Sequence, residues 1–185
     1  MIQSDLVVKI RYKIQNRERL INYGESVMNN IEYKIATADD IDLLMSSRLE
    51  MLREVNDLSD DYQYDESFVE NSREYFLRGD QTTVLALDGE KVIGCGSVSY
   101  IWIMPTFAHP TGKRGHLMNV YTNKNYRRMG IAQKMMDILM EDARKKGATE
   151  ISLDATTAGR PLYAKNGFTD STECMVLNCP KESAD

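Results

Sequence analysis

The chain has 185 residues, of which 42% are hydrophobic and 28% are charged, and its formal net charge is −5. This composition is typical of a globular protein and argues against collagen-like and low-complexity chains. The acidic balance argues against a general binder of nucleic acid or of anionic membranes, because such proteins carry basic surfaces. We therefore expect no nucleic-acid partner and no membrane partner.

Side chains that bind metals or form disulfides are few. The three cysteines, an odd number without dense spacing, predict reduced thiols and a cytoplasmic protein, not a disulfide framework. The two histidines show no zinc-binding spacing, so we expect no metal. The longest apolar stretch, 92–104, is too short to span a bilayer, and basic residues interrupt the apolar N-terminus that a signal peptide would need.

Three segments are expected along the chain. Residues 1–30 are an N-terminal extension, read as a short helix or a tail, residues 31–180 form the main domain, and residues 181–185 are a tail. A second hypothesis places the natural start at Met28, because Gly24-Glu25 can be encoded by a purine-rich ribosome-binding sequence. The nucleotide sequence of the gene would test this.

From residue 31 the hydrophobic pattern becomes regular. It predicts a strand at 31–36, a helix from about 39–40 to 52 capped by Thr37, an acidic loop at 57–65, a helix at 66–78, strands at 82–87 and 91–103, a loop at 104–115 and a strand at 116–122. It further predicts a helix at 128–146, a strand at 150–155, a short helix from Pro161 to Gly167 and a last strand at 174–179. This order favours an α/β (α+β) fold, a mixed sheet with helices on both faces.

The segment 126–132, Tyr-Arg-Arg-Met-Gly-Ile-Ala, joins a strand to the clearest amphipathic helix. No capping side chain stands at Arg127 or Arg128, so the first helical amides lack a side-chain partner, and Gly130 permits close approach. Free amides, a helix dipole and guanidinium groups together favour a pyrophosphate site. The alternative is a basic turn that only opens a helix. Neither a Walker loop nor a dinucleotide fingerprint is present.

These residues resemble the GNAT superfamily of acyl-CoA-dependent N-acetyltransferases. The family's phosphate motif reads here Arg127-x-x-Gly130-x-Ala132, and its second motif reads Leu-Tyr-Ala-Lys-Asn-Gly-Phe at 162–168. The resemblance implies a single domain with a mixed, mostly antiparallel central sheet. It also implies acetyl transfer from acetyl-CoA, a cosubstrate, to a primary amine by direct attack in a ternary complex. The alternatives are a non-catalytic acyl-CoA-binding or sensor module and a binder of another phosphorylated ligand.

The resemblance assigns roles to residues of two segments. The backbone amides near the helix start should hold the CoA pyrophosphate, beside the Arg127 side chain; they belong to Arg128, Met129, Gly130, Ile131, Ala132 and Gln133. Val120 and Thr122 should pair with the pantetheine arm through their backbone, next to a bulge in the central strand. An amide near Val120 or Tyr121 would polarise the thioester carbonyl.

The two catalytic candidates are Tyr163 and His116. Tyr163 matches the tyrosine that protonates the departing thiolate in many relatives; its alternative role is ring packing. Met118 stands where some relatives have a glutamate base, and strand alternation places His116 on the same face, so His116 is a candidate base. The alternatives are a capping histidine, Asp154 as the base, or deprotonation through water. Thr156 replaces a CoA-contacting asparagine of many relatives.

The acceptor amine is not specified by the sequence. An acidic segment at 57–66 could attract a cation, and aromatic residues at 100–107 could line a pocket, although a solvated loop and core packing explain them as well. Small amines, antibiotics, peptide N-termini and protein lysines all stay open as acceptors, as does a homodimer formed through exposed strand edges.

Overall fold

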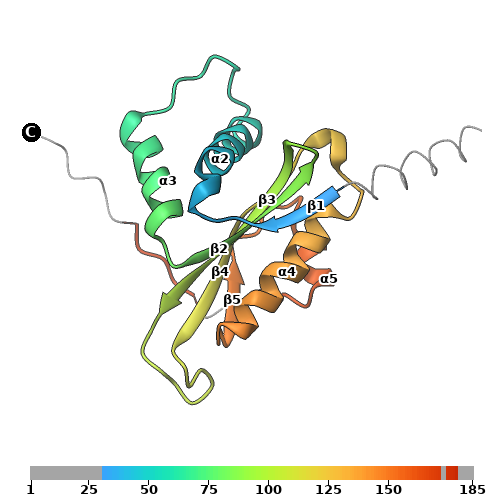
Figure 1. Cartoon of the computed structure of the whole chain (residues 1–185). Helices are drawn as coiled ribbons and strands as arrows, with labels where there is room; N and C mark the ends of the chain where they lie inside the picture. The colour runs from blue at the N-terminus through green and yellow to red at the C-terminus, as the bar shows by residue number, and fades with distance from the viewer. Residues whose placement is uncertain (1–30, 172–173, 179–185) are drawn as a thin grey trace, which may run out of the picture. The chain divides into compact units, whose positions relative to one another are not determined.

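The computed structural model of the chain describes residues 31–171 and 174–178 (Figure 1). The predicted extension 1–30, with its hypothetical start at Met28, and the tail 181–185 lie outside the described residues. The chain divides into two compact units, one reaching to Leu153 and one beginning at Asp154. Each unit is described by itself.

The first unit is built on a five-stranded sheet. Its strands are β1 (Ile31–Ile35), β2 (Gln81–Asp88), β3 (Lys91–Trp102), β4 (Lys113–Thr122) and β5 (Glu150–Leu153), and they lie in the order β1-β2-β3-β4-β5. The first three pairings are antiparallel and the β4–β5 pairing is parallel. The predicted mixed, mostly antiparallel sheet is therefore confirmed.

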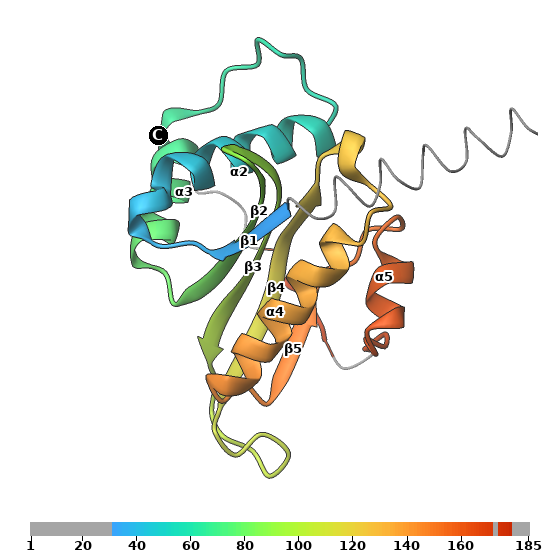
Figure 2. The ribbon, with the colours of Figure 1, turned by 45° about the vertical axis from the view of Figure 1, so that its right-hand side comes forward.

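Helices cover both faces of this sheet (Figures 1 and 2). The short η1 (Ala38–Asp40) leads into α2 (Ile41–Val55), which lies with α3 (Glu66–Arg78) on one face, and α4 (Ile131–Lys145) lies on the other. A single turn, η2 (Lys124–Tyr126), precedes α4. The second unit contains α5 (Arg160–Lys165).

The helix starts on the α2–α3 face follow from local capping. The Thr37 amide donates to the Asp40 carboxylate at 3.0 Å, so the chain turns directly from β1 into η1 and α2. The Asp65 carboxylate accepts the Phe68 amide at 3.0 Å and starts α3 at the predicted residue.

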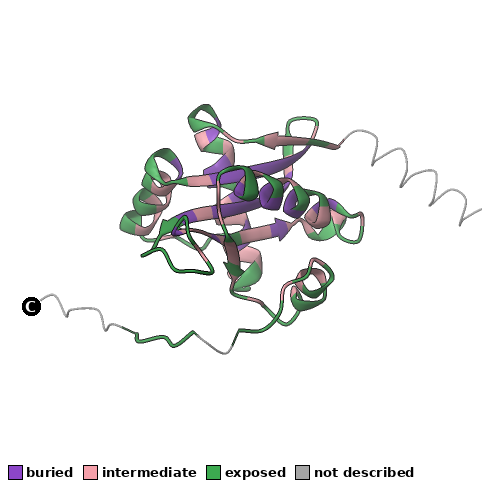
Figure 3. Cartoon of the chain, turned by 90° about the horizontal axis from the view of Figure 1, so that it is seen from below, coloured by how far each residue is buried: buried purple, intermediate pink, exposed green. Residues whose placement is uncertain are grey.

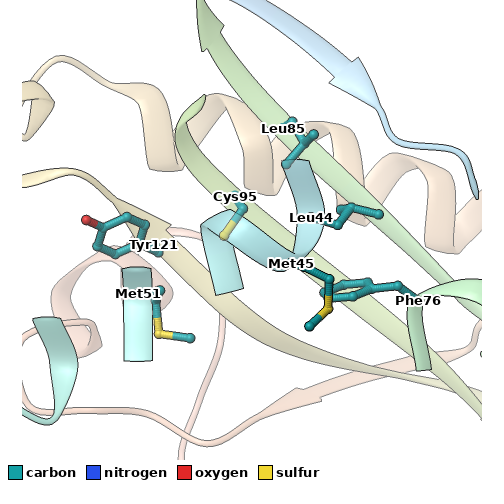
Figure 4. Close-up of a cluster of buried hydrophobic side chains, with 7 residues drawn as sticks. All are labelled: Leu44, Met45, Met51, Phe76, Leu85, Cys95 and Tyr121. Atoms are coloured by element: carbon teal, nitrogen blue, oxygen red, sulfur yellow. The ribbon is translucent and has the colours of Figure 1, made fainter. Parts of the chain in front are cut away.

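Buried residues concentrate on the central strands and on the helix faces that meet them (Figure 3). On the α2–α3 face they form one cluster, Leu44, Met45, Met51, Phe76, Leu85, Cys95 and Tyr121 (Figure 4). On the opposite face α4 packs close to two glycines of β3. A Cβ on Gly94 would lie 3.2 Å from Met135, and one on Gly96 would lie 3.1 Å from Leu139. The absence of side chains there lets α4 approach the strand closely.

A polar network fixes the C-terminal end of α4 against β2 and β3. The Asp142 carboxylate accepts hydrogen bonds from Thr82 at 2.6 Å and from the Tyr100 hydroxyl at 2.9 Å, and it forms an ion pair with Lys146 at 3.1 Å. Burial raises the pKa of Asp142, but these bonds outweigh it and leave the pKa below its ordinary value. These contacts hold the C-terminal end of α4 on the sheet.

Several predicted element ends differ from the structure by one to three residues, and three differences bear on the site or on the fold. The helix expected from residue 128 begins at Ile131, because Arg128 and Gly130 adopt left-handed φ angles of 66° and 81°. Strand β4 begins at Lys113, within the predicted loop, because β3 continues to pair with it as far as Trp102. The predicted strand 174–179 is wrong for residues 174–178, which form no strand and whose Met, Val and Leu side chains are at least 80% exposed.

Candidate active site

A bulge interrupts the central strand β4 at Asn119. Ser97 pairs with Met118 and Cys95 pairs with Tyr121, so two β4 residues, Asn119 and Val120, lie opposite one residue of β3. Asn119 has a left-handed φ of 57°, which is uncommon for a residue with a side chain. Such a bulge re-aims the backbone groups that follow it.

Beyond the bulge, β4 is no longer paired with the parallel strand β5. Strand β5 pairs only with residues 114–117 and ends at Leu153, whereas β4 continues to Thr122. Within the described residues, no strand pairs with 118–122 on the β5 side. Backbone groups of Val120, Tyr121 and Thr122 can therefore accept an extended, amide-containing molecule as an added strand.

The chain then reaches the N-terminus of α4. Gly130 is the N-cap residue and offers no capping side chain, and the first helical hydrogen bond runs from the Lys134 amide to the Gly130 carbonyl at 3.0 Å. The amides of Ile131 and Ala132 precede this bond, so they have no partner within the helix. A Cβ built on Gly130 would meet nothing within 4 Å, so the approach to these amides is open. This end of α4 has the features of an anion site.

The two arginines of this turn differ in their environment. The Arg127 guanidinium donates from Nε to the Thr122 carbonyl at 3.1 Å and forms an ion pair with Glu54 of α2, which binds the turn to β4 and α2. Arg128 is exposed and forms no ion pair within the described residues. Arg128 is therefore better placed than Arg127 to offer its positive charge to an anion at this turn.

The phenol of Tyr121 faces away from the open edge, toward α2. Its hydroxyl donates to Glu54 at 2.7 Å and contacts Glu50 at 3.2 Å. Burial and these two carboxylates raise its pKa well above the ordinary value. Tyr121 can thus serve the site through its backbone, while its side chain fixes β4 to α2.

In the second unit, Tyr163 lies within α5. A Cβ at Gly159 would lie 2.7 Å from the Tyr163 ring, so glycine leaves the space that the ring occupies. The ring packs edge-on against Phe168, with centroids 6.1 Å apart, and Gly167 ends the helix with a φ of 87°. Burial raises the pKa of Tyr163, which keeps the phenol protonated at neutral pH. It is therefore suited to donate a proton.

His116 and Met118 lie on one face of β4, as strand alternation predicts. They pair with Ser99 and Ser97, two residues apart on β3. The His116 ring forms a hydrogen bond through Nδ1 with the Ser152 hydroxyl at 3.0 Å, which restrains the ring. Met118 is 39% exposed and contacts the Tyr75 hydroxyl of α3 at 3.6 Å, so it lies on the face that α2 and α3 cover.

The cysteine nearest the bulge is not a nucleophile. Cys95 is 1% exposed, and burial raises the pKa of its thiol to about 11. Its Sγ lies 3.4 Å from the Asn119 carbonyl, so the side chain fills space beneath the bulge.

The two segments considered for the acceptor contribute less than the sequence suggests. Asp61 accepts a hydrogen bond from Ser59, and Asp65 caps α3, so these carboxylates stabilise local structure. Tyr100 is buried on the α4 face, whereas Phe107 is fully exposed in the loop before β4, so these two aromatic residues do not line one pocket. Sequence reasoning missed Arg48, whose Nη1 donates to Asn119 Oδ1 at 2.9 Å across 71 positions of the chain.

The described residues hold neither a cluster that could bind a metal ion nor a helix that could span a membrane. Among the residues that the structure describes, no group of three or more His, Cys, Asp or Glu side chains could hold a metal ion. In the same residues, every helix is too short or too polar to cross a bilayer.

Comparison with known proteins defines the class. Residues 49–168 match the model of the acetyltransferase (GNAT) family, so the chain belongs to this family. A glucosamine 6-phosphate N-acetyltransferase of Dictyostelium discoideum is 27% identical over 159 residues, which span 83% of this chain and 94% of that protein. One of Arabidopsis thaliana is 26% identical over 111 residues, or 58% of this chain and 72% of that protein.

Solved structures agree with the fold. A predicted acetyltransferase from Clostridium acetobutylicum, crystallised with acetyl-CoA, aligns with a TM-score of 0.70 at 29% identity, covering 80% of this chain and 96% of that one. A GCN5-related N-acetyltransferase from Ralstonia eutropha aligns with a TM-score of 0.64 at 25% identity, covering 80% and 98%. The protein is thus an acetyl-CoA-dependent N-acetyltransferase.

Proposed function

We propose that the enzyme binds acetyl-CoA along the open edge of β4 and passes the acetyl group directly to a bound primary amine. The observation that carries the proposal is the continuity of two features in the first unit: the unpaired edge at 118–122 and the uncapped helix start at Gly130. One accepts an extended pantetheine arm and the other accepts a pyrophosphate.

The roles of the backbone follow from this placement. The amides from Arg128 to Gln133 hold the pyrophosphate, and Val120 and Thr122 pair with the pantetheine amides. The bulge at Asn119 turns an amide of Val120 or Tyr121 toward the thioester carbonyl. A pre-oriented donor of this kind contributes about 100- to 1,000-fold to the rate.

The reaction is then a direct displacement. The neutral amine nitrogen forms a bond to the carbonyl carbon, and the carbon–sulfur bond breaks. The Tyr163 phenol gives its proton to the departing thiolate and is restored from solvent. His116, held by Ser152, accepts the proton that the amine loses. No covalent bond to the enzyme forms.

For the acceptor, we propose a small-molecule primary amine. The relatives from Dictyostelium and Arabidopsis are named for glucosamine 6-phosphate, which supports a small, polar acceptor. The test is release of the CoA thiol from acetyl-CoA with a panel of amines, including glucosamine 6-phosphate, other amino sugars, amino acids and a peptide. CoA binding without turnover on any amine would instead favour a non-catalytic acyl-CoA-binding module.

We propose residues 31–180 as the limits of the acetyltransferase domain. The family match at 49–168 lies inside these limits, and the described elements begin at Ile31. A variant starting at Met28 should bind CoA and turn over like the full chain. Loss of activity in that variant would assign a role to the preceding residues.

A further inference from the structure

Among the described residues of the first unit, one arginine lies beside the bulge without a carboxylate partner. Arg48 belongs to α2 and is half-buried, and its Nη1 donates to the side-chain oxygen of Asn119 at 2.9 Å. Its guanidinium carries further N–H donors, and this bond uses one of them.

Four of the eight arginines described in this unit form an ion pair, and Arg48 is one of the four that form none, with Arg53, Arg128 and Arg144. Within the described residues no carboxylate lies within ion-pair distance of Arg48, whereas four other arginines have one: Arg73, Arg78, Arg114 and Arg127. Burial lowers the pKa of Arg48, and the titratable groups close enough to influence it are Cys95, Tyr75 and Tyr64, none of which is a carboxylate. A half-buried cation without a counter-ion is unfavourable unless an anion joins it.

The position of Arg48 relates it to the reacting groups. Its partner Asn119 precedes Val120, where the thioester carbonyl lies in the proposed function. On the same side of β4, the exposed Met118 contacts the Tyr75 hydroxyl at 3.6 Å. Because Arg48 bonds the residue next to Val120, an amine attacking there from this side would present its other groups toward the guanidinium.

We propose that Arg48 binds an anionic group of the acceptor, a phosphate monoester or a carboxylate, and so selects amines that carry one. The inference rests on the proposed function and specifies its acceptor. A guanidinium suits both anions, because its planar fork of donors matches two of their oxygens. If Arg48 served only to brace the bulge through Asn119, it would affect all acceptors equally.

The experiment compares acceptors that differ only in the anion. The pairs are glucosamine 6-phosphate with glucosamine, and an ω-amino acid with its amide. Each is assayed with wild type, Arg48→Gln, Arg48→Lys and the control Arg73→Gln, which removes the same charge from an exposed ion pair with Asp42. Calorimetry follows binding of the anionic member of each pair to the CoA-loaded protein.

We expect Arg48→Gln to lower kcat/KM for the preferred anionic acceptor by about 10- to 100-fold. The neutral partner should change by less than about threefold, within the weak range of a surface charge. Arg48→Lys should recover part of the loss, Arg73→Gln should match wild type, and the better of the two anionic acceptors identifies the group.

Equal loss with both members of a pair would overturn the inference and leave Arg48 as a brace. Equal binding of the anionic acceptor to wild type and Arg48→Gln would overturn it too. Failure of the proposed function would look different: no amine is acetylated by wild type, while binding of the anionic acceptor still depends on Arg48.

Discussion

Replacing Gly130 by alanine separates the stability of α4 from the binding of CoA. Gly130 has a φ of 81°, a conformation that L side chains rarely adopt, and an added Cβ would meet nothing within 4 Å. The substitution therefore costs backbone strain without a clash, about 1–2 kcal/mol. For a protein of this length each kcal/mol lowers Tm by about 2–4 °C.

Gly147 provides the matched control at the other end of the same helix. Its φ is 82°, and a Cβ there would also meet nothing within 4 Å. Gly147→Ala should therefore lower Tm by a similar amount. Only Gly130→Ala should weaken CoA binding, by about 10- to 100-fold, because it disturbs the amides that receive the pyrophosphate.

The assay combines thermal unfolding with calorimetry of CoA binding. Acetyl transfer from S-acetylpantetheine, which lacks the pyrophosphate, should change little in Gly130→Ala relative to Gly147→Ala. Equal CoA affinities in the two variants would refute the placement of the pyrophosphate at this helix start.

Three further predictions concern single side chains. Tyr163→Phe should lower kcat by about 100-fold or more with CoA affinity unchanged. Burial raises the pKa of Tyr163, so the phenol should stay protonated and, below about pH 10, the kcat of the wild type should not fall through loss of this proton. An unchanged kcat in Tyr163→Phe would exclude Tyr163 as the proton donor. His116→Gln should lower kcat/KM by about 100-fold at pH 7 and by less at pH 9.5, where more of the acceptor amine is already neutral; an equal loss at both pH values would argue against a base. Asp142→Asn should lower the free energy of unfolding by about 2 kcal/mol at pH 7, because its three partners lose a charged acceptor. The pKa of Asp142 is lowered in the folded state, so this stabilisation is present above the unfolded pKa near ~4 and is lost as the pH falls through the lower folded value. Urea unfolding should show the difference at pH 7 and a smaller one at pH 3, whereas an equal difference would contradict the cause given.

Local signals in the sequence predicted most of the elements. The apolar residues within 66–78 predicted α3 with the correct start, and the spacing around Gly130 marked the turn before α4. The start of α4 was placed three residues early, because a left-handed Arg128 leaves no signature in residue type. The strand predicted at 174–179 rested on apolar composition alone, which does not supply a pairing partner.

The parts of the site that depend on long-range contacts were not predictable. Arg48 and Asn119 are 71 positions apart, and neither belongs to a motif. The ion pair of Arg127 with Glu54 likewise joins residues whose proximity depends on how α2 lies over β4. Spacing along one segment cannot indicate which charges a fold brings together.

Two-substrate initial-rate kinetics test the central claim most directly. CoA thiol release would be measured over a grid of acetyl-CoA and amine concentrations, with the acceptor that the amine panel identifies. Direct attack in a ternary complex predicts amine-dependent release and double-reciprocal lines that intersect. Parallel lines, or an acetyl group found covalently on the protein before amine is added, would contradict it.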